Sequence, residues 1–177
     1  MKSSLILFPL LLAACAANPG GSSSPKIASP AAASDRAALI DRMKTLAGSW
    51  ETTGPEGTAV ASVFTVCSGG SAVREVLMPG TESEMTNMYT MDGPTMVMTH
   101  YCAMGNQPHM RARAGSDPKV IRLESDGVSD LKSAEEPYMG AVTLTFVDAD
   151  HLTAEWYQFK GGKKVDETTK FELTRKK

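Results

Sequence analysis

A methionine-rich stretch carries the residues best suited to chemistry. Seven of the 11 methionines fall between positions 85 and 110, together with His100 and Cys102. Thioether, thiolate and imidazole groups suit Cu(I), and the candidate ligands are Met85, Met98, His100 and Cys102. Methionine also fills irregular cores and lines adaptable apolar pockets. The absence of a closely spaced Met–His string in the sequence favours this second interpretation.

Several polar side chains fall among these methionine and aromatic positions. A few polar groups in an apolar lining are typical of a small-ligand pocket. The same groups can instead form an internal hydrogen-bond network that fixes the fold, and both interpretations stay open. The candidate pocket residues are Asn87, Tyr89, Met96, Met98, His100, Trp156 and Gln158. Glu167 and Glu75 are further polar candidates. The sequence leaves open whether the Glu75 side chain points into or out of the barrel.

Enzyme activity is not expected, since the sequence contains no familiar catalytic motif. His100 and Cys102 are two residues apart on one strand face, roughly 7 Å between Cα atoms, which is too far for a direct hydrogen bond. Haem ligation by a histidine of the last strand is not expected either, because 164–174 contains no histidine. We therefore predict no cofactor, with copper as the alternative.

The composition excludes several classes of protein. The chain has 177 residues, of which 42% are hydrophobic and 21% charged, and its formal net charge is −2. Nucleic-acid binding is not expected, because it requires a basic surface. A disordered chain would be less apolar, so we expect one folded domain with additional segments.

Residues 1–14 have the features of a bacterial signal peptide, in the usual order. Lys2 supplies a positive charge, and a short apolar run ends in Leu-Ala-Ala-Cys at 12–15. This ending resembles the lipobox of bacterial lipoproteins, which implies that 1–14 are removed and that Cys15 is acylated. Ala16 follows instead of aspartate, which in Gram-negative lipoproteins implies sorting to the outer membrane. We expect a lipid-anchored envelope protein that faces the periplasm.

Residues 15–34 are predicted to comprise the acylated cysteine and a flexible tether, and 35–177 the folded domain. Sixteen of the 19 residues in 16–34 are Ala, Ser, Gly or Pro, so this stretch has nothing to bury. A flexible chain of this length spans roughly 25 Å. Without Lys2 the chain has 17 basic and 20 acidic residues, so the acyl groups are the expected membrane contact.

The domain is predicted to be all-β with one short N-terminal helix. The helix covers 35–47, with Ser34 as its N-cap and Gly48 at its end. From Gly48 onward apolar and polar residues alternate, and turn signals separate the runs. The expected strands are 49–54, 57–67, 71–79, 85–91, 95–103, 109–113, 119–124, 140–147, 151–160 and 164–174, with 125–139 as the one long connection. This pattern predicts an up-and-down antiparallel β-barrel of about 8–10 strands.

Tight turns assign the faces of these strands. A two-residue loop at 92–93 pairs Met85 with His100 and places the methionine-rich face inside. A similar loop at 161–162 places Trp156 inside. In such an up-and-down sheet the remaining cysteines, at positions 67 and 102, end at opposite rims. Their separation of about 20 Å exceeds the ~7 Å Cα limit for a disulfide, so both are predicted to be free thiols.

The start of the first strand, Gly48-Ser49-Trp50, resembles the Gly-x-Trp opening of lipocalin-like barrels. There the tryptophan closes the barrel floor and a late arginine stacks on it, which implies that Arg175 lies against Trp50. Residues 46–174 also resemble a family of uncharacterised bacterial secreted proteins with a lipocalin-like barrel. The matching stretches are 69–73, 99–102, 105–108 and 146–151. The resemblance implies a fold and transfers no activity.

Three functions remain open at this point. The leading hypothesis is a lipid-anchored barrel that binds a small apolar or amphipathic ligand without a covalent bond. The alternatives are a periplasmic copper-handling protein and a filled barrel that acts as a structural or interaction module. An interior cavity below about 300 Å³ would be smaller than typical ligand pockets and would favour the filled barrel.

Overall fold

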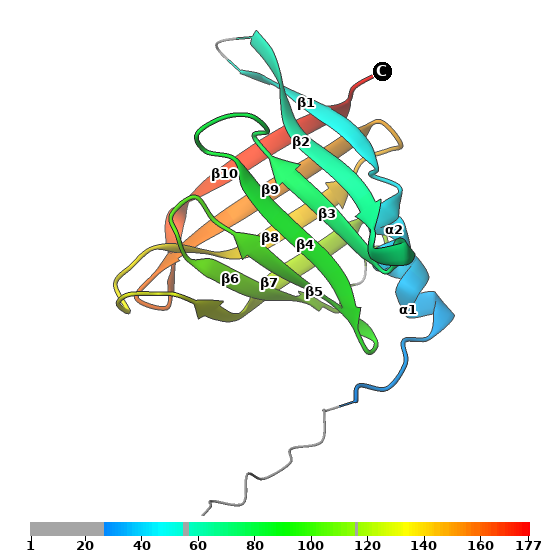
Figure 1. The fold of residues 1–177 in the computed structure, drawn as a ribbon, viewed down its shortest axis with the longest axis horizontal. Helices are drawn as coiled ribbons and strands as arrows, with labels where there is room; N and C mark the ends of the chain where they lie inside the picture. The colour runs from blue at the N-terminus through cyan, green and yellow to red at the C-terminus, as the bar shows by residue number, and fades with distance from the viewer. Residues whose placement is uncertain (1–26, 55–56, 116) are drawn as a thin grey trace, which may run out of the picture.

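The folded part of the chain is a closed β-barrel. The computed structural model describes residues 27–54, 57–115 and 117–177, so the predicted signal peptide and Cys15 lie outside the described residues. Ten antiparallel strands follow one another around the barrel, and β1 pairs with β10 to close it (Figure 1). The predicted all-β, up-and-down architecture is confirmed.

The predicted strands are all present, with ends that differ by a few residues. They are β1 Gly48–Gly54, β2 Gly57–Cys67, β3 Ala72–Leu77, β4 Met85–Asp92, β5 Thr95–Tyr101, β6 Gln107–Arg113, β7 Val120–Ser129, β8 Tyr138–Phe146, β9 His151–Lys160 and β10 Lys163–Arg175. The largest difference is in β7, which continues past its predicted end at residue 124. It continues because Gly127, with a φ of +126°, accommodates a bulge opposite β6. The predicted long connection 125–139 shortens accordingly.

Two short helices form where one is predicted. α1 covers Ala33–Ala38 and α2 covers Ile40–Lys44, because Leu39 between them has a φ of −115° and a ψ of −90°. The prediction of Ser34 as the N-cap is wrong. Ser34 lies inside α1, and Ala32 occupies the cap position without a side-chain hydrogen bond. No helix in the described ranges is long and apolar enough to cross a membrane.

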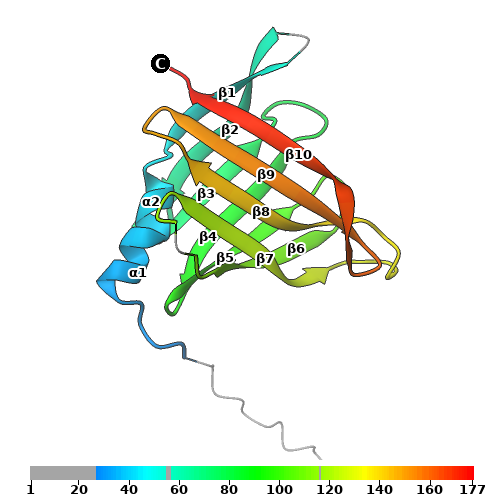
Figure 2. The same ribbon diagram turned by 180° about the vertical axis from the view of Figure 1, so that it is seen from behind.

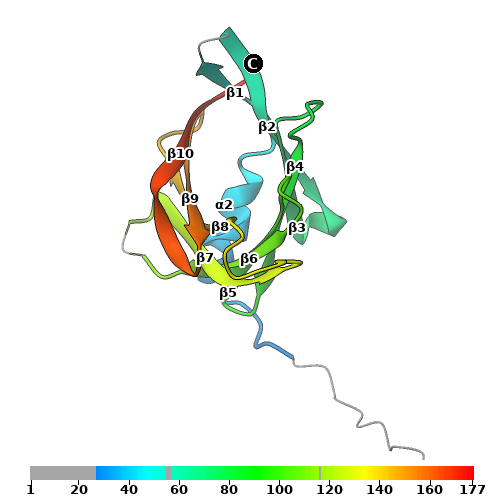
Figure 3. The same cartoon turned by 90° about the vertical axis from the view of Figure 1, so that its left-hand side faces the viewer.

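The second helix, α2, packs its apolar face against one end of the barrel core. It buries Ile40 and Met43. Figure 1 shows it at one end of the barrel, and in Figure 3 it is seen through the ring of strands from the opposite end. Beside it, the indole Nε1 of Trp50 donates a hydrogen bond of 2.7 Å to the carbonyl oxygen of Leu46. The guanidinium carbon of Arg175 lies 4.4 Å from the centroid of the Trp50 ring. This is the stacking contact that the resemblance to lipocalin-like barrels implies.

The β4–β5 hairpin has a different register from the predicted one. Its loop is 93–94, so Asn87 pairs with His100 and Met85 does not. Gly93 has a φ of +60° and is followed by a proline with its fixed negative φ, which is the pattern of a type II′ turn. The shift is two residues, so every side chain keeps its predicted face.

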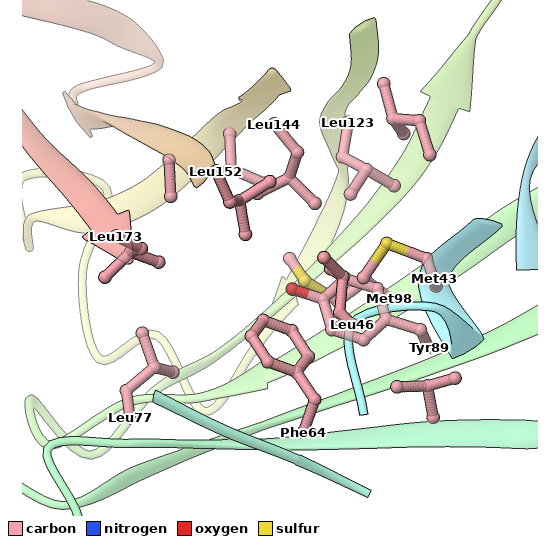
Figure 4. Close-up of a cluster of buried hydrophobic side chains, with 14 of the residues drawn as sticks. Met43, Leu46, Phe64, Leu77, Tyr89, Met98, Leu123, Leu144, Leu152 and Leu173 are labelled. Atoms are coloured by element: carbon pink, nitrogen blue, oxygen red, sulfur yellow. The ribbon is translucent and has the colours of Figure 1, made fainter. Parts of the chain in front are cut away.

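Apolar side chains fill most of the barrel interior. Figure 4 shows side chains such as Phe64, Tyr89 and Met98 pointing from one wall towards leucines of the opposite wall. That opposite wall is formed by β7 to β10 (Figure 2). In it the β9–β10 register shifts by two residues between Lys164 and Thr168, which again preserves the predicted faces. The predicted inward position of Trp156 is confirmed, since it lies in the core cluster.

Candidate functional site

A cluster of hydrogen-bonded polar side chains runs along the inner face of β2 to β5. At its centre is the carboxylate of Glu75, which is 3% exposed. Ser62 Oγ donates to one carboxylate oxygen at 2.8 Å. Asn87 Nδ2 and the hydroxyl of Tyr89 each donate to the other oxygen at 2.7 Å. Three donors thus compensate in part for the burial of this carboxyl group.

Strand pairing brings these residues together. Glu75 of β3 lies directly opposite Asn87 of β4, which lies opposite His100 of β5. The sequence left the direction of Glu75 open, and the structure places its side chain inside. Ser62 was missed by the sequence analysis, although it shares its strand face with the buried Phe64 and could have been found from that alternation.

The hydrogen bonds of Asn87 decide which nitrogen of His100 carries its proton. The amide nitrogen of Asn87 faces Glu75, so its oxygen faces His100 Nδ1 at 2.7 Å. An amide oxygen only accepts, so Nδ1 must donate and Nε2 has a free lone pair. Burial lowers the pKa of His100 to about 4, so the imidazole is neutral at neutral pH.

Two buried groups of this region have no hydrogen-bond partner. They are the Nε2 of His100 and the indole Nε1 of Trp156. The two rings are neighbours, with centroids 5.0 Å apart and planes inclined at 45°. One group is an acceptor and the other is a donor. Buried polar groups without partners are rare in folded proteins, so a further polar group that reached either atom would bind favourably.

A small void lies beside the same tryptophan. Its volume is about 10 Å³, which is enough for about one water molecule and far below the roughly 300–1,000 Å³ of ligand pockets. It is lined by Ala61, Ser62, Glu75, Leu77, Met78, Ala154, Trp156, Phe171 and Leu173. An expected cavity that encloses a whole ligand therefore does not form here, because large side chains from opposite walls meet in the interior.

The candidate pocket residues mostly lie inside, as their strand faces predict. Those that are buried are Asn87, Tyr89, Met96, Met98, His100 and Trp156. Gln158 is only half-buried and pairs with Met139 near the start of β8. Glu167 is exposed on β10, so it does not join the internal cluster.

The four candidate copper ligands differ in their surroundings. Met98 and His100 are buried, whereas Met85 and Cys102 are half-buried. Burial raises the pKa of the Cys102 thiol, which disfavours the thiolate that a soft metal needs. Within the described residues, no group of three or more His, Cys, Asp or Glu side chains could hold a metal ion. Cys67 and Cys102 are both free thiols.

A larger hollow of about 450 Å³ lies on the outer surface over β7 to β10. Gly140 and Ala141 form part of its lining, together with Tyr157 and Phe159. None of the described residues in this lining has a buried polar atom without a partner. The internal cluster is therefore a stronger candidate site than this hollow.

Comparison with known proteins adds no assignment to this geometry. The chain matches no protein-family model. No curated protein matches it either.

Proposed function

We propose that this chain is a lipid-anchored envelope protein whose barrel binds the polar end of a small amphipathic molecule. The anchor is the acylated Cys15, and the residues from 16 to the start of α1 at Ala33 form the tether. This part rests on the sequence pattern at 1–16, which resembles that of bacterial lipoproteins. The proposal of ligand binding rests on the internal polar cluster and on one solvent-facing end of the barrel.

The proposed entrance is the loop end, defined as the barrel end that carries the loops 78–84, 102–106 and 130–137. The void reaches this end, since Leu77 and Met78 line it. Two flexible apolar side chains, Met85 and Met139, are half-buried just after two of these loops and pack against the core. Methionine adapts its shape easily, so these side chains offer apolar surface to the body of a ligand.

The observation that supports this proposal best is the unpartnered pair, His100 Nε2 and Trp156 Nε1, because Trp156 lines a void of about 10 Å³ and its ring lies 5.0 Å from that of His100. The void accommodates one polar group and no more. The apolar part of the ligand must then lie at the loop end and not inside the barrel. This refines the expectation of a ligand enclosed in a dry cavity.

The volume of the void favours a second candidate function, a filled barrel that acts as a structural or interaction module. In that case the internal cluster fixes the strand register and binds nothing. Such clusters are common in folded proteins when every member is hydrogen-bonded. The two candidates differ in whether the unpartnered pair has a ligand.

The test is native mass spectrometry of the full acylated protein in detergent, titrated with 1-decanol, decanoate and decylamine. Saturable binding of at least one probe supports the proposal, provided that Trp156→Phe weakens it at least tenfold. Tyr157→Phe, which changes the neighbouring outward side chain, is the matched control and should bind normally. No saturable binding of any probe would overturn the proposal in favour of the filled barrel, and so would equal binding by the Trp156→Phe protein.

A further inference from the structure

The internal site offers an unusual pair of hydrogen-bonding groups. Trp156 Nε1–H can only donate. His100 Nε2 can only accept, because the bond from Nδ1 to Asn87 at 2.7 Å holds the proton on the other nitrogen. Neither group has a partner, and both atoms are buried. Trp156 links the two features, since it lines the void and its ring lies 5.0 Å from that of His100.

The chemistry of a guest follows from this pair. A carboxylate has acceptors only, so its lone pairs would be repelled by the lone pair on His100 Nε2. An ammonium group has donors only, so it would oppose the indole N–H. A hydroxyl group has one donor and two acceptor sites, and it can therefore satisfy both groups at once.

The surroundings also disfavour an anionic guest and limit the size of any guest. The carboxyl group of Glu75 lines the same void and would repel an anion when it is ionised. No described Lys or Arg side chain lines the void to offset that repulsion. A hydroxyl oxygen has the size of a water molecule, which a void of about 10 Å³ accommodates.

We infer that the barrel selects ligands whose polar end is a single uncharged hydroxyl group, which accepts from Trp156 Nε1–H and donates to His100 Nε2. The inference rests on the proposed function, because it names the chemistry recognised at that same site. The ligand class is a long-chain or otherwise apolar alcohol. Fatty acids and alkylamines with the same apolar part are excluded by their head groups.

The experiment compares chain-matched probes on the full acylated protein at neutral pH. Dissociation constants are measured for 1-decanol, decanoate, decylamine and decane. We expect 1-decanol to bind at least tenfold more tightly than each of the other three, since each of them leaves a buried polar group unpaired. In Trp156→Phe the preference for 1-decanol over decane should fall below threefold.

A second variant tests the acceptor. His100→Gln should reduce the alcohol preference in the same way, whereas His109→Gln, a change outside the barrel core, should leave it unaltered. Decanoate or decylamine binding as tightly as 1-decanol would overturn the hydroxyl inference while leaving the proposed function in place. Equal binding of decane and 1-decanol would overturn it as well. Failure of all four probes to bind would overturn the proposed function itself.

Discussion

At the scale of single residues, the buried polar cluster is organised around one carboxyl group. Burial raises the pKa of Glu75, although hydrogen bonds from Tyr89, Asn87 and Ser62 oppose that shift. Burial and the neighbouring carboxyl group raise the pKa of Tyr89 well above its usual range, which keeps it a hydrogen-bond donor. Asn87 donates its amide N–H to Glu75 and therefore presents its amide oxygen to His100. His100 must then carry its proton on Nδ1, so its unprotonated Nε2 is a consequence of where Glu75 lies.

The buried imidazole predicts a pH dependence of stability. The folded protein keeps His100 neutral down to a pKa of about 4, whereas the free side chain has a pKa of 6.5. Between these values only the unfolded chain binds the proton, so stability falls as the pH drops through this window. The shift corresponds to about 3 kcal/mol at its largest. Replacing His100 with glutamine should remove this loss.

The measurement is urea denaturation of the wild type and His100→Gln from pH 7 to pH 4. Glu75 titrates in both proteins, and its raised pKa makes stability fall as pH rises above 4.5, so its effect cancels in the difference. The difference in free energy of unfolding should change by about 3 kcal/mol across the series. Parallel curves for the two proteins would show that the imidazole is not buried neutral. His109→Gln serves as the control.

At the scale of secondary-structure elements, irregular positions set the shape of the barrel wall. In β8 the register shifts between Met139 and Ala141, so Gly140 is the extra residue of a bulge. The bulge reverses the alternation of faces and turns Tyr138 towards Phe159, with ring centroids 5.9 Å apart. The Phe159 ring covers Gly140 so closely that a Cβ atom there would overlap it.

Gly140→Ala should therefore destabilise the protein by about 1–3 kcal/mol, because the ring must move to admit the methyl group. Gly54→Ala in β1 is a matched control, since nothing lies within 4 Å of its Cβ position, and its effect should stay within about 0.5 kcal/mol. Chemical denaturation measures both. In a Phe159→Ala background the cost of Gly140→Ala should disappear, and a cost that persisted there would refute the steric explanation.

The end of β10 joins the helical segment to the barrel. Arg175 donates hydrogen bonds to the carbonyl oxygens of Thr45 and Ala47 at 2.8 Å and 2.9 Å, while it stacks on Trp50. A lysine cannot reproduce this planar fork. Arg175→Lys should lower the free energy of unfolding by about 1–3 kcal/mol.

The control for this change is Arg113→Lys, because Arg113 pairs with Glu124 where both side chains are about half exposed. Exposed ion pairs contribute little, so the control should lose less than about 1 kcal/mol. Equal losses in the two variants would contradict the role assigned to Arg175. Urea denaturation at neutral pH is the measurement.

At the scale of the whole molecule, the chain reaches the barrel at the helix end. Residues 28 and 29 lie beside the β4–β5 turn, since a Cβ on Gly93 would come within 3.0 Å of the Ser29 carbonyl oxygen. Most of the proposed tether precedes this point, and the loop end lies on the other side of the molecule (Figure 1). An anchored barrel would thus hold its helix end nearer the lipid and its proposed binding end away from it.

Cys15→Ala should abolish both acylation and membrane attachment. A single lipid-bearing residue is the only anchor proposed, and stable attachment needs its acyl chains. Metabolic labelling with an alkyne fatty acid and fractionation of the cell envelope measure the two effects. Cys102→Ala is the control and should remain labelled in the membrane fraction. Labelling that survives in Cys15→Ala would contradict the lipoprotein proposal.

The sequence by itself determined the strands and the faces of their side chains. Alternation has a period of two and turns are coded by local residues, so ten strands and inward positions such as Tyr89, Met98 and His100 can be predicted from short stretches. Register errors of two residues in the β4–β5 hairpin and of similar size in β9–β10 left these faces correct.

Only the tertiary structure decided which residues oppose one another and how much space they leave. The pairing of Asn87 with His100, the inward direction of Glu75 and the partnerless Nε1 of Trp156 depend on strands that are distant in the sequence. The void of about 10 Å³ is the small remainder after side chains from all walls have packed. Composition fixes the total volume of those side chains, but the way they interdigitate across the barrel fixes the volume that stays unfilled.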